Sequence, residues 1–137
     1  MNRTIAREKL MQALFQMETQ KDFSDEAISR YIELNLDGDD TQKEYVSTVI
    51  TAFRENRSEI DALIEQYSKG WKLGRIAKVD LAAMRLCLAE SMFLPEDEKV
   101  PIGVAINEAV KIVKKYGEDG SGKFVNGILG EISRNIK

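Results

Sequence analysis

The chain has 137 residues, 43% of them hydrophobic, which is enough to bury one core and predicts a single domain over residues 1–137. Its 20 basic and 23 acidic side chains give a net charge of -3, which excludes coating of nucleic acid by bulk attraction and restricts such contact to a local patch. With Cys87 as the one cysteine and no histidine, the sequence excludes a disulfide framework, the usual zinc sites and histidine-dependent nucleophiles.

Neither a signal-peptide core nor a run of about 20 apolar residues is visible, so we expect a cytoplasmic protein without a membrane span. Apolar residues recur at helical spacing, and no stretch alternates as a strand does. The first predicted helix covers residues 4–21, with Thr4 as its cap. A second begins at Ser24 and ends near Leu36, before an acidic turn at residues 37–40.

The middle of the chain predicts three more helices. Apolar residues over 45–53 define the third, and a cap at Ser58 leads the fourth. The fifth, over residues 76–94, is apolar almost all round and stops at Pro95. We therefore expect it to be the central helix of the fold.

Two helices close the chain. Pro101 suits the start of the sixth helix, which ends at Gly117, and Ser121 begins the seventh. No repeat period is visible. The sequence thus predicts an all-α fold, a compact and irregular bundle of about seven helices.

Three basic side chains stand near the start of the first helix. Arg3 and Arg7 are one turn apart at one edge of its apolar stripe, and Lys9 lies at the other edge. Guanidinium groups at such a place can bind phosphates and reach base edges, so the cluster is a candidate nucleic-acid contact. The alternative is a solvated helix end.

Phe15 projects far round the first helix from the apolar stripe, so it is either a second core contact or an anchor for a partner. On the sixth helix, Asn107, Lys111 and Lys114 share the polar side. The helix dipole is sufficient to explain a lysine near the C-terminus, such as Lys114. A functional role would require a second basic element that converges on it.

The most informative segment is residues 121–127, which starts a helix behind a flexible loop. Helix N-termini attract anions and Lys123 adds charge, while Asn126 can hydrogen-bond base edges and Phe124 can stack on an unpaired base. The alternative is structural: Phe124 fills the core, and Gly127 lets two helices approach closely. The glycines near this segment match neither the dinucleotide fingerprint nor the P-loop, and the paired acids of the chain lie in turns, which argues against catalysis.

Four stretches of the chain together resemble the bacterial transcription antitermination factor NusB family. They are RE with QALF at residues 7–8 and 12–15, VD with MRL at 79–80 and 84–86, AINEAV at 105–110, and KFVNGIL at 123–129. The resemblance therefore spans essentially the whole chain.

The resemblance implies a seven-helix fold without enzymatic activity or a cofactor, which binds the boxA RNA of ribosomal-RNA leader transcripts. It also implies pairing with NusE, a small-subunit ribosomal protein. The pair would then join other Nus factors on RNA polymerase to suppress premature termination.

Position by position, the resemblance assigns RNA binding to two elements and partner binding to a third. The RNA-binding positions are Arg3, Arg7, Lys123, Phe124 and Asn126. We add Lys9 to them, because it belongs to the basic cluster of the first helix. Phe15 and Asp80 match positions that face NusE. Thr4 and Ile5 interrupt what is often a denser arginine run, so we expect weak RNA binding by the isolated chain and a larger contribution from the partner.

Two alternatives use the same fold. NusB-like domains also begin ribosomal-RNA cytosine methyltransferases, but no α/β region, cofactor-binding glycine motif or catalytic cysteine context follows here. The second is a helical protein-binding module or homodimer, in which Phe15, Trp71 and the central helix bury the interface.

Overall fold

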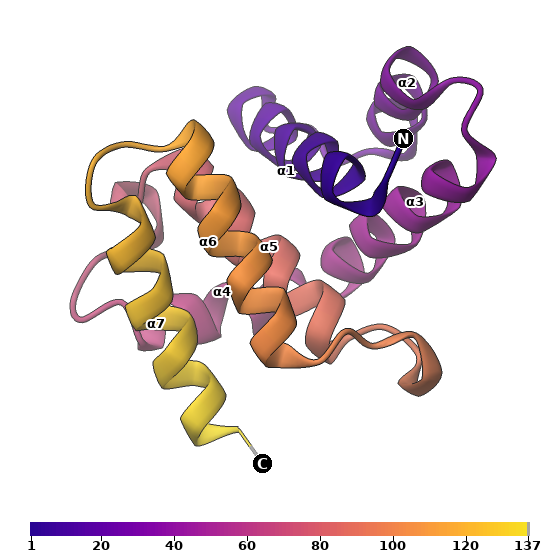
Figure 1. The fold of residues 1–137 in the computed structure, drawn as a ribbon. Helices are drawn as coiled ribbons and strands as arrows, with labels where there is room; N and C mark the ends of the chain where they lie inside the picture. Colours follow the sequence, from indigo (N-terminus) through magenta and orange to yellow (C-terminus); the bar gives the residue numbers. More distant parts are fainter. Residues whose placement is uncertain (137) are drawn as a thin grey trace.

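The computed structural model describes residues 1–136, which form seven α-helices and contain no strand. The helices are α1 (Arg3–Gln20), α2 (Asp25–Leu36), α3 (Asp40–Glu55), α4 (Arg57–Gln66), α5 (Lys78–Met92), α6 (Ile102–Tyr116) and α7 (Ser121–Asn135). Two short 3-10 turns, η1 (Leu73–Arg75) and η2 (Glu96–Glu98), precede α5 and α6. The predicted all-α bundle is confirmed, with its helices in the expected order (Figure 1).

Two of the predicted caps were wrong. Asn2, not Thr4, caps α1, because its backbone is extended and its side chain accepts a hydrogen bond from the Ile5 amide at 2.9 Å. Helix α4 begins directly after Asn56, which also ends α3, so no turn is left for Ser58 to cap.

The cap predicted at Ser24 is confirmed, since its hydroxyl accepts from the Ala27 amide at 3.1 Å. Helix α5 is shorter than the predicted 76–94, because Ile76 and Ala77 have non-helical backbone between η1 and α5, and Phe93 ends the helix.

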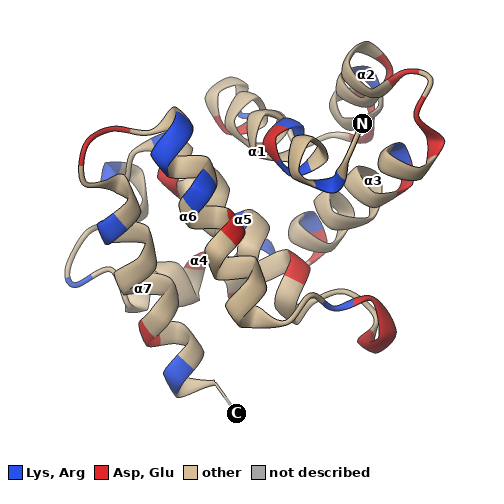
Figure 2. Ribbon diagram, in the orientation of Figure 1, with Lys and Arg blue, Asp and Glu red and all other residues tan. Residues whose placement is uncertain are grey.

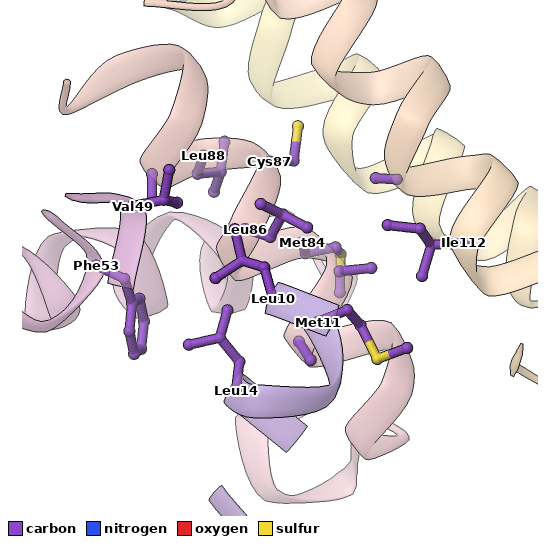
Figure 3. Close-up of a cluster of buried hydrophobic side chains, with 14 of the residues drawn as sticks. Leu10, Met11, Leu14, Val49, Phe53, Met84, Leu86, Cys87, Leu88 and Ile112 are labelled. Carbon is purple, nitrogen blue, oxygen red and sulfur yellow. The ribbon is translucent and has the colours of Figure 1, made fainter. Parts of the chain in front are cut away.

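Helix α5 lies at the centre of the bundle, as expected. Every residue from 80 to 90 is buried, and the helix packs against α1, α3, α4, α6 and α7. Figure 3 shows part of the core, where Leu10 and Leu14 of α1 and Phe53 of α3 gather around Leu86 of α5. Burial of these side chains is the main driving force that holds the helices together.

Arg85 of α5 is charged but only 1% exposed. Its Nε and Nη2 donate to the two carboxylate oxygens of Asp61 on α4, each at 2.9 Å, and its Nη1 donates to Glu18 of α1 at 2.7 Å. A bidentate pair of this kind fixes geometry as well as charge. Arg85 therefore joins three helices through one guanidinium.

Helix α6 lies between α1 and α7 (Figure 1). On the α1 side, Lys115 and the Tyr116 hydroxyl of α6 donate to Glu8, at 3.0 and 2.7 Å. On the other side, α6 packs along α7. Helix α6 therefore contacts the second turn of α1 on one side and α7 on the other. Within residues 1–136, no helix has the length and apolar character that a membrane crossing requires.

Candidate nucleic-acid interface

Arg3 opens α1 as an exposed cation beside α3. Its guanidinium carbon lies 3.8 Å from the centre of the Tyr45 ring, and its Nε donates to Gln42 at 3.0 Å. Stacking on the ring leaves much of the guanidinium open to solvent. Arg3 is thus placed where a phosphate can approach it.

Arg7, one turn later, is buried. Its Nε donates to Glu90 of α5 at 2.9 Å, and its Nη1 donates to Glu108 of α6 at 3.2 Å. Burial by itself lowers the pKa of Arg7, but the neighbouring Tyr45, Glu90 and Glu108 outweigh it and raise the pKa, so the side chain stays charged. The solvated-end interpretation is wrong for Arg7, which connects α1, α5 and α6, and its RNA-binding role stays a prediction.

Lys9 does not join the two arginines. It is half-buried beside α2, where its carbonyl oxygen accepts a hydrogen bond from the Tyr31 hydroxyl at 2.7 Å. Burial raises the pKa of Tyr31 to about 12, so the phenol remains a donor. Arg3 and Arg7 therefore share Tyr45 of α3 as a neighbour, at 3.8 and 5.9 Å from the ring centre, and Arg7 also reaches α5 and α6, whereas Lys9 contacts α2 through its backbone.

The start of α7 keeps its predicted polar residues at the surface. Lys123 and Asn126 are exposed, and Phe124 is half-buried at the edge of the core. All three line one cavity of about 540 Å³, together with Trp71 from the connection between α4 and α5. The structural interpretation is thus correct in part for Phe124, which packs on the core while facing the cavity.

Gly127 does not serve close helix packing, contrary to the structural alternative. A Cβ atom added there would meet no atom within 4 Å. At Gly122 the situation differs, since an added Cβ would lie 3.1 Å from Cε of Lys114 on α6. Lys114 of α6 therefore lies against the start of α7. That helix start carries Lys123, so it is the second basic element that a functional role for Lys114 requires.

Basic residues continue along the exposed side of α6. Asn107, Lys111 and Lys114 are all exposed, and Lys111 also donates to Glu108 at 3.0 Å. Figure 2 shows blue segments along α6 and at the starts of α1 and α7, while red segments mark the loop before α7. The positive surface is local, as expected for an acidic chain.

Asp80, a predicted partner contact, lies in a second cavity of about 340 Å³ that shares Trp71 and Phe124 with the first. Asp80 is 5% exposed, and its Oδ1 has no hydrogen-bond partner among residues 1–136. Burial raises the pKa of its carboxyl, the charge of Glu118 raises it further, and Ser121 lowers it. No group of acidic or cysteine side chains in the described chain is arranged to hold a metal.

Phe15, the other predicted partner contact, is 37% exposed on α1. The interpretation as a second core contact is therefore wrong. Phe15 lines neither of the two cavities, whereas Asp80 lines one of them together with Ser121 and Phe124 at the start of α7. Its role as a partner anchor stays a prediction.

Sequence reasoning missed the contribution of the connection between α4 and α5. Tyr67, Lys69 and Trp71 line the same cavity as Phe124, although more than 50 residues separate them in sequence. The available signal was an aromatic residue between two glycines with lysines on both sides. Only the packing of α4 against α7 shows where that loop lies.

Comparison with known proteins is consistent with this geometry. The model of the NusB family matches residues 4–134. The chain is 43% identical over 132 residues to the transcription antitermination protein NusB of Acetivibrio thermocellus. The aligned region covers 96% of this chain and 88% of that protein.

Solved structures show the same fold. NusB of T. maritima has a TM-score of 0.85 at 38% identity, over 98% of this chain and 92% of that one. A chain in the crystal structure of the antitermination factors NusB and NusE in complex with double-stranded RNA has a TM-score of 0.84 at 26% identity, over 98% of this chain and 97% of that one.

Proposed function

Because the chain belongs to the NusB family, we propose that it is a transcription antitermination factor, which binds boxA RNA of ribosomal-RNA leader transcripts together with NusE. In this role it acts by binding and catalyses no reaction. With other Nus factors on RNA polymerase, the bound pair suppresses premature termination.

One observation carries the proposal: Lys123, Phe124 and Asn126 all line a single cavity that opens to solvent at the start of α7. A lysine, an aromatic ring and an amide supply the three contacts that an unpaired nucleotide needs, namely phosphate attraction, stacking and hydrogen bonding to a base edge.

The rest of the interface follows from the order of the helices. Lys114 of α6 lies against the start of α7, and Lys111 stands one turn earlier on the same helix, so both can contact RNA that is bound at the start of α7. Arg7 holds α1 against α5 and α6, so it positions the start of α1. Few phosphate contacts are available, which supports a strong dependence on the protein partner.

Fluorescence anisotropy of a labelled single-stranded boxA RNA, with and without NusE, tests the proposal. Lys123→Gln and Phe124→Ala should each weaken binding about tenfold, from the loss of one phosphate contact or one stacked base. Arg30→Gln removes an exposed charge from α2 and should bind as the parent does. The proposal is wrong if both α7 variants retain parental affinity in the presence of NusE.

A further inference from the structure

Trp71 is the chain's one tryptophan, and 53% of its surface is exposed. It lies in the connection between α4 and η1, outside the helices. A large aromatic side chain left in water forgoes the burial that would stabilise the fold. A single exposed apolar side chain is normal on a protein surface, so the role of Trp71 follows from what surrounds it and not from exposure alone.

The backbone around Trp71 is held in place. Ser68 is 1% exposed, its hydroxyl lies 2.5 Å from the Trp71 carbonyl oxygen, and the Trp71 amide donates to the Ser68 carbonyl at 3.3 Å. Gly70 supports the turn with a φ of +90°, which side-chain-bearing residues rarely adopt. The Leu73 amide donates to the Glu65 carboxylate at 2.8 Å. Trp71 is therefore presented to solvent from a fixed turn.

Trp71 shares the cavity of about 540 Å³ with two other aromatic side chains, Tyr67 and Phe124. Both are half-buried and pack against the core, so they form a firm base. A cavity lined by three aromatic rings suits a flat, unsaturated ligand, since stacking needs a planar partner.

The charged residues that line each cavity indicate whether it fits an anionic or a cationic ligand. The cavity's charged lining residues are Lys69 and Lys123, and no acidic residue lines it. The adjoining cavity is the reverse, since Asp80, Glu118 and Asp119 outnumber its one arginine. The first therefore suits a polyanion, whereas the second suits a cationic group.

We propose that Trp71 and Phe124 are two walls of a pocket for one unpaired nucleobase of the bound RNA, with Lys69 and Lys123 contacting its phosphates. The inference rests on the proposed function and adds the loop between α4 and α5 to the RNA interface. It assigns Trp71 to RNA rather than to a homodimer face. Asn126, at the same cavity, is placed to hydrogen-bond the edge of that base.

The single tryptophan makes the test direct. Binding of a single-stranded boxA RNA, in the presence of NusE selected or mutated to contain no tryptophan, should quench the emission of Trp71, because a stacked base changes the ring's environment. A series of the same RNA with one abasic nucleotide at each position should then locate the base, since quenching should be lost at one position while binding persists.

Variants provide the second readout. Trp71→Ala should weaken RNA binding about tenfold, and Trp71→Phe should restore most of it, because the aromatic face is kept. Leu34→Ala removes another exposed apolar side chain, 77% exposed on α2, and should bind RNA normally. Thermal unfolding of each variant confirms that the fold is retained.

The outcomes separate this inference from the proposed function. RNA binding that leaves Trp71 emission unchanged, with full affinity in Trp71→Ala, overturns the pocket and leaves the function intact. Loss of NusE binding alone in Trp71→Ala assigns the cavity to the protein partner and also overturns it. If the parent binds no boxA RNA even with NusE, both are wrong.

Discussion

Arg7 of α1 donates a hydrogen bond to Glu90 of α5 at 2.9 Å, which joins residues 83 positions apart in the chain. Glu90 is 1% exposed and also accepts a hydrogen bond from the Tyr45 hydroxyl of α3. A residue that resembles a family RNA contact is therefore also part of the interior of this protein.

Removal of the Arg7 side chain should destabilise the fold, because it leaves the Glu90 carboxylate buried with one hydrogen-bond partner fewer. We expect Arg7→Ala to lower the free energy of unfolding by about 3 kcal/mol, measured by urea denaturation. Arg3→Ala is the control and should lower it by less than about 1 kcal/mol, since Arg3 is exposed. Equal stability of the two variants would contradict the structural role of Arg7.

Asp80 should make stability depend on pH. Burial raises the pKa of its carboxyl above the ordinary value of 3.8, so ionisation is easier in the unfolded chain than in the folded one. Its stabilising contribution is complete below pH 3.8 and is lost as the pH rises through the folded pKa.

Asp80→Asn removes this titration. The variant should be more stable than the parent at pH 7, on the order of 1 kcal/mol, because an unpaired buried carboxylate is costly. The advantage should shrink toward zero as the pH falls below about 4, measured by urea denaturation across a pH series. If the added stability of Asp80→Asn does not change with pH, ionisation of the Asp80 carboxyl is not its cause.

Phe15 should contribute to partner binding and little to folding. Because its ring is 37% exposed, Phe15→Ala should change the free energy of unfolding by less than about 1 kcal/mol. Calorimetric titration with NusE should show affinity reduced tenfold or more, as expected for an aromatic anchor in an interface (about 2 kcal/mol). Leu34→Ala should leave that affinity unchanged, and full NusE affinity in Phe15→Ala would place the partner surface elsewhere.

A substitution at Gly127 should affect the stability of the fold and the affinity for RNA in opposite directions. Gly127→Ala should stabilise α7 by roughly 1 kcal/mol, because glycine is a poor helix former and the new methyl group meets open space. The same methyl group narrows the cavity that Lys123 and Phe124 line, so RNA affinity should fall.

The matched control for Gly127→Ala is Gly103→Ala, which also meets open space but lies at the start of α6, away from the cavity. It should leave anisotropy titrations with boxA RNA unchanged. If Gly127→Ala also leaves RNA affinity unchanged, the RNA does not enter this cavity.

Helix positions could be predicted from sequence because each helix carries its own signal. The apolar spacing, the stop at Pro95 and the cap at Ser24 all act within a few residues of where they are found. The caps at Thr4 and Ser58 were mispredicted because an asparagine precedes each of them. Asn2 accepts the hydrogen bond from the first turn of α1, and α4 already begins after Asn56. Local competition of this kind is hard to rank from sequence.

By itself, the sequence determined an all-α chain with a local basic surface, and it placed a lysine, a phenylalanine and an asparagine at the start of α7. Tertiary structure alone decided that Arg7 is buried against Glu90 and that Trp71 stands beside Phe124 at a cavity. Helical periodicity determines which side of a helix an arginine occupies. Whether a carboxylate or water meets the arginine there depends on a helix 83 residues away, which only the packing of the whole chain brings into place.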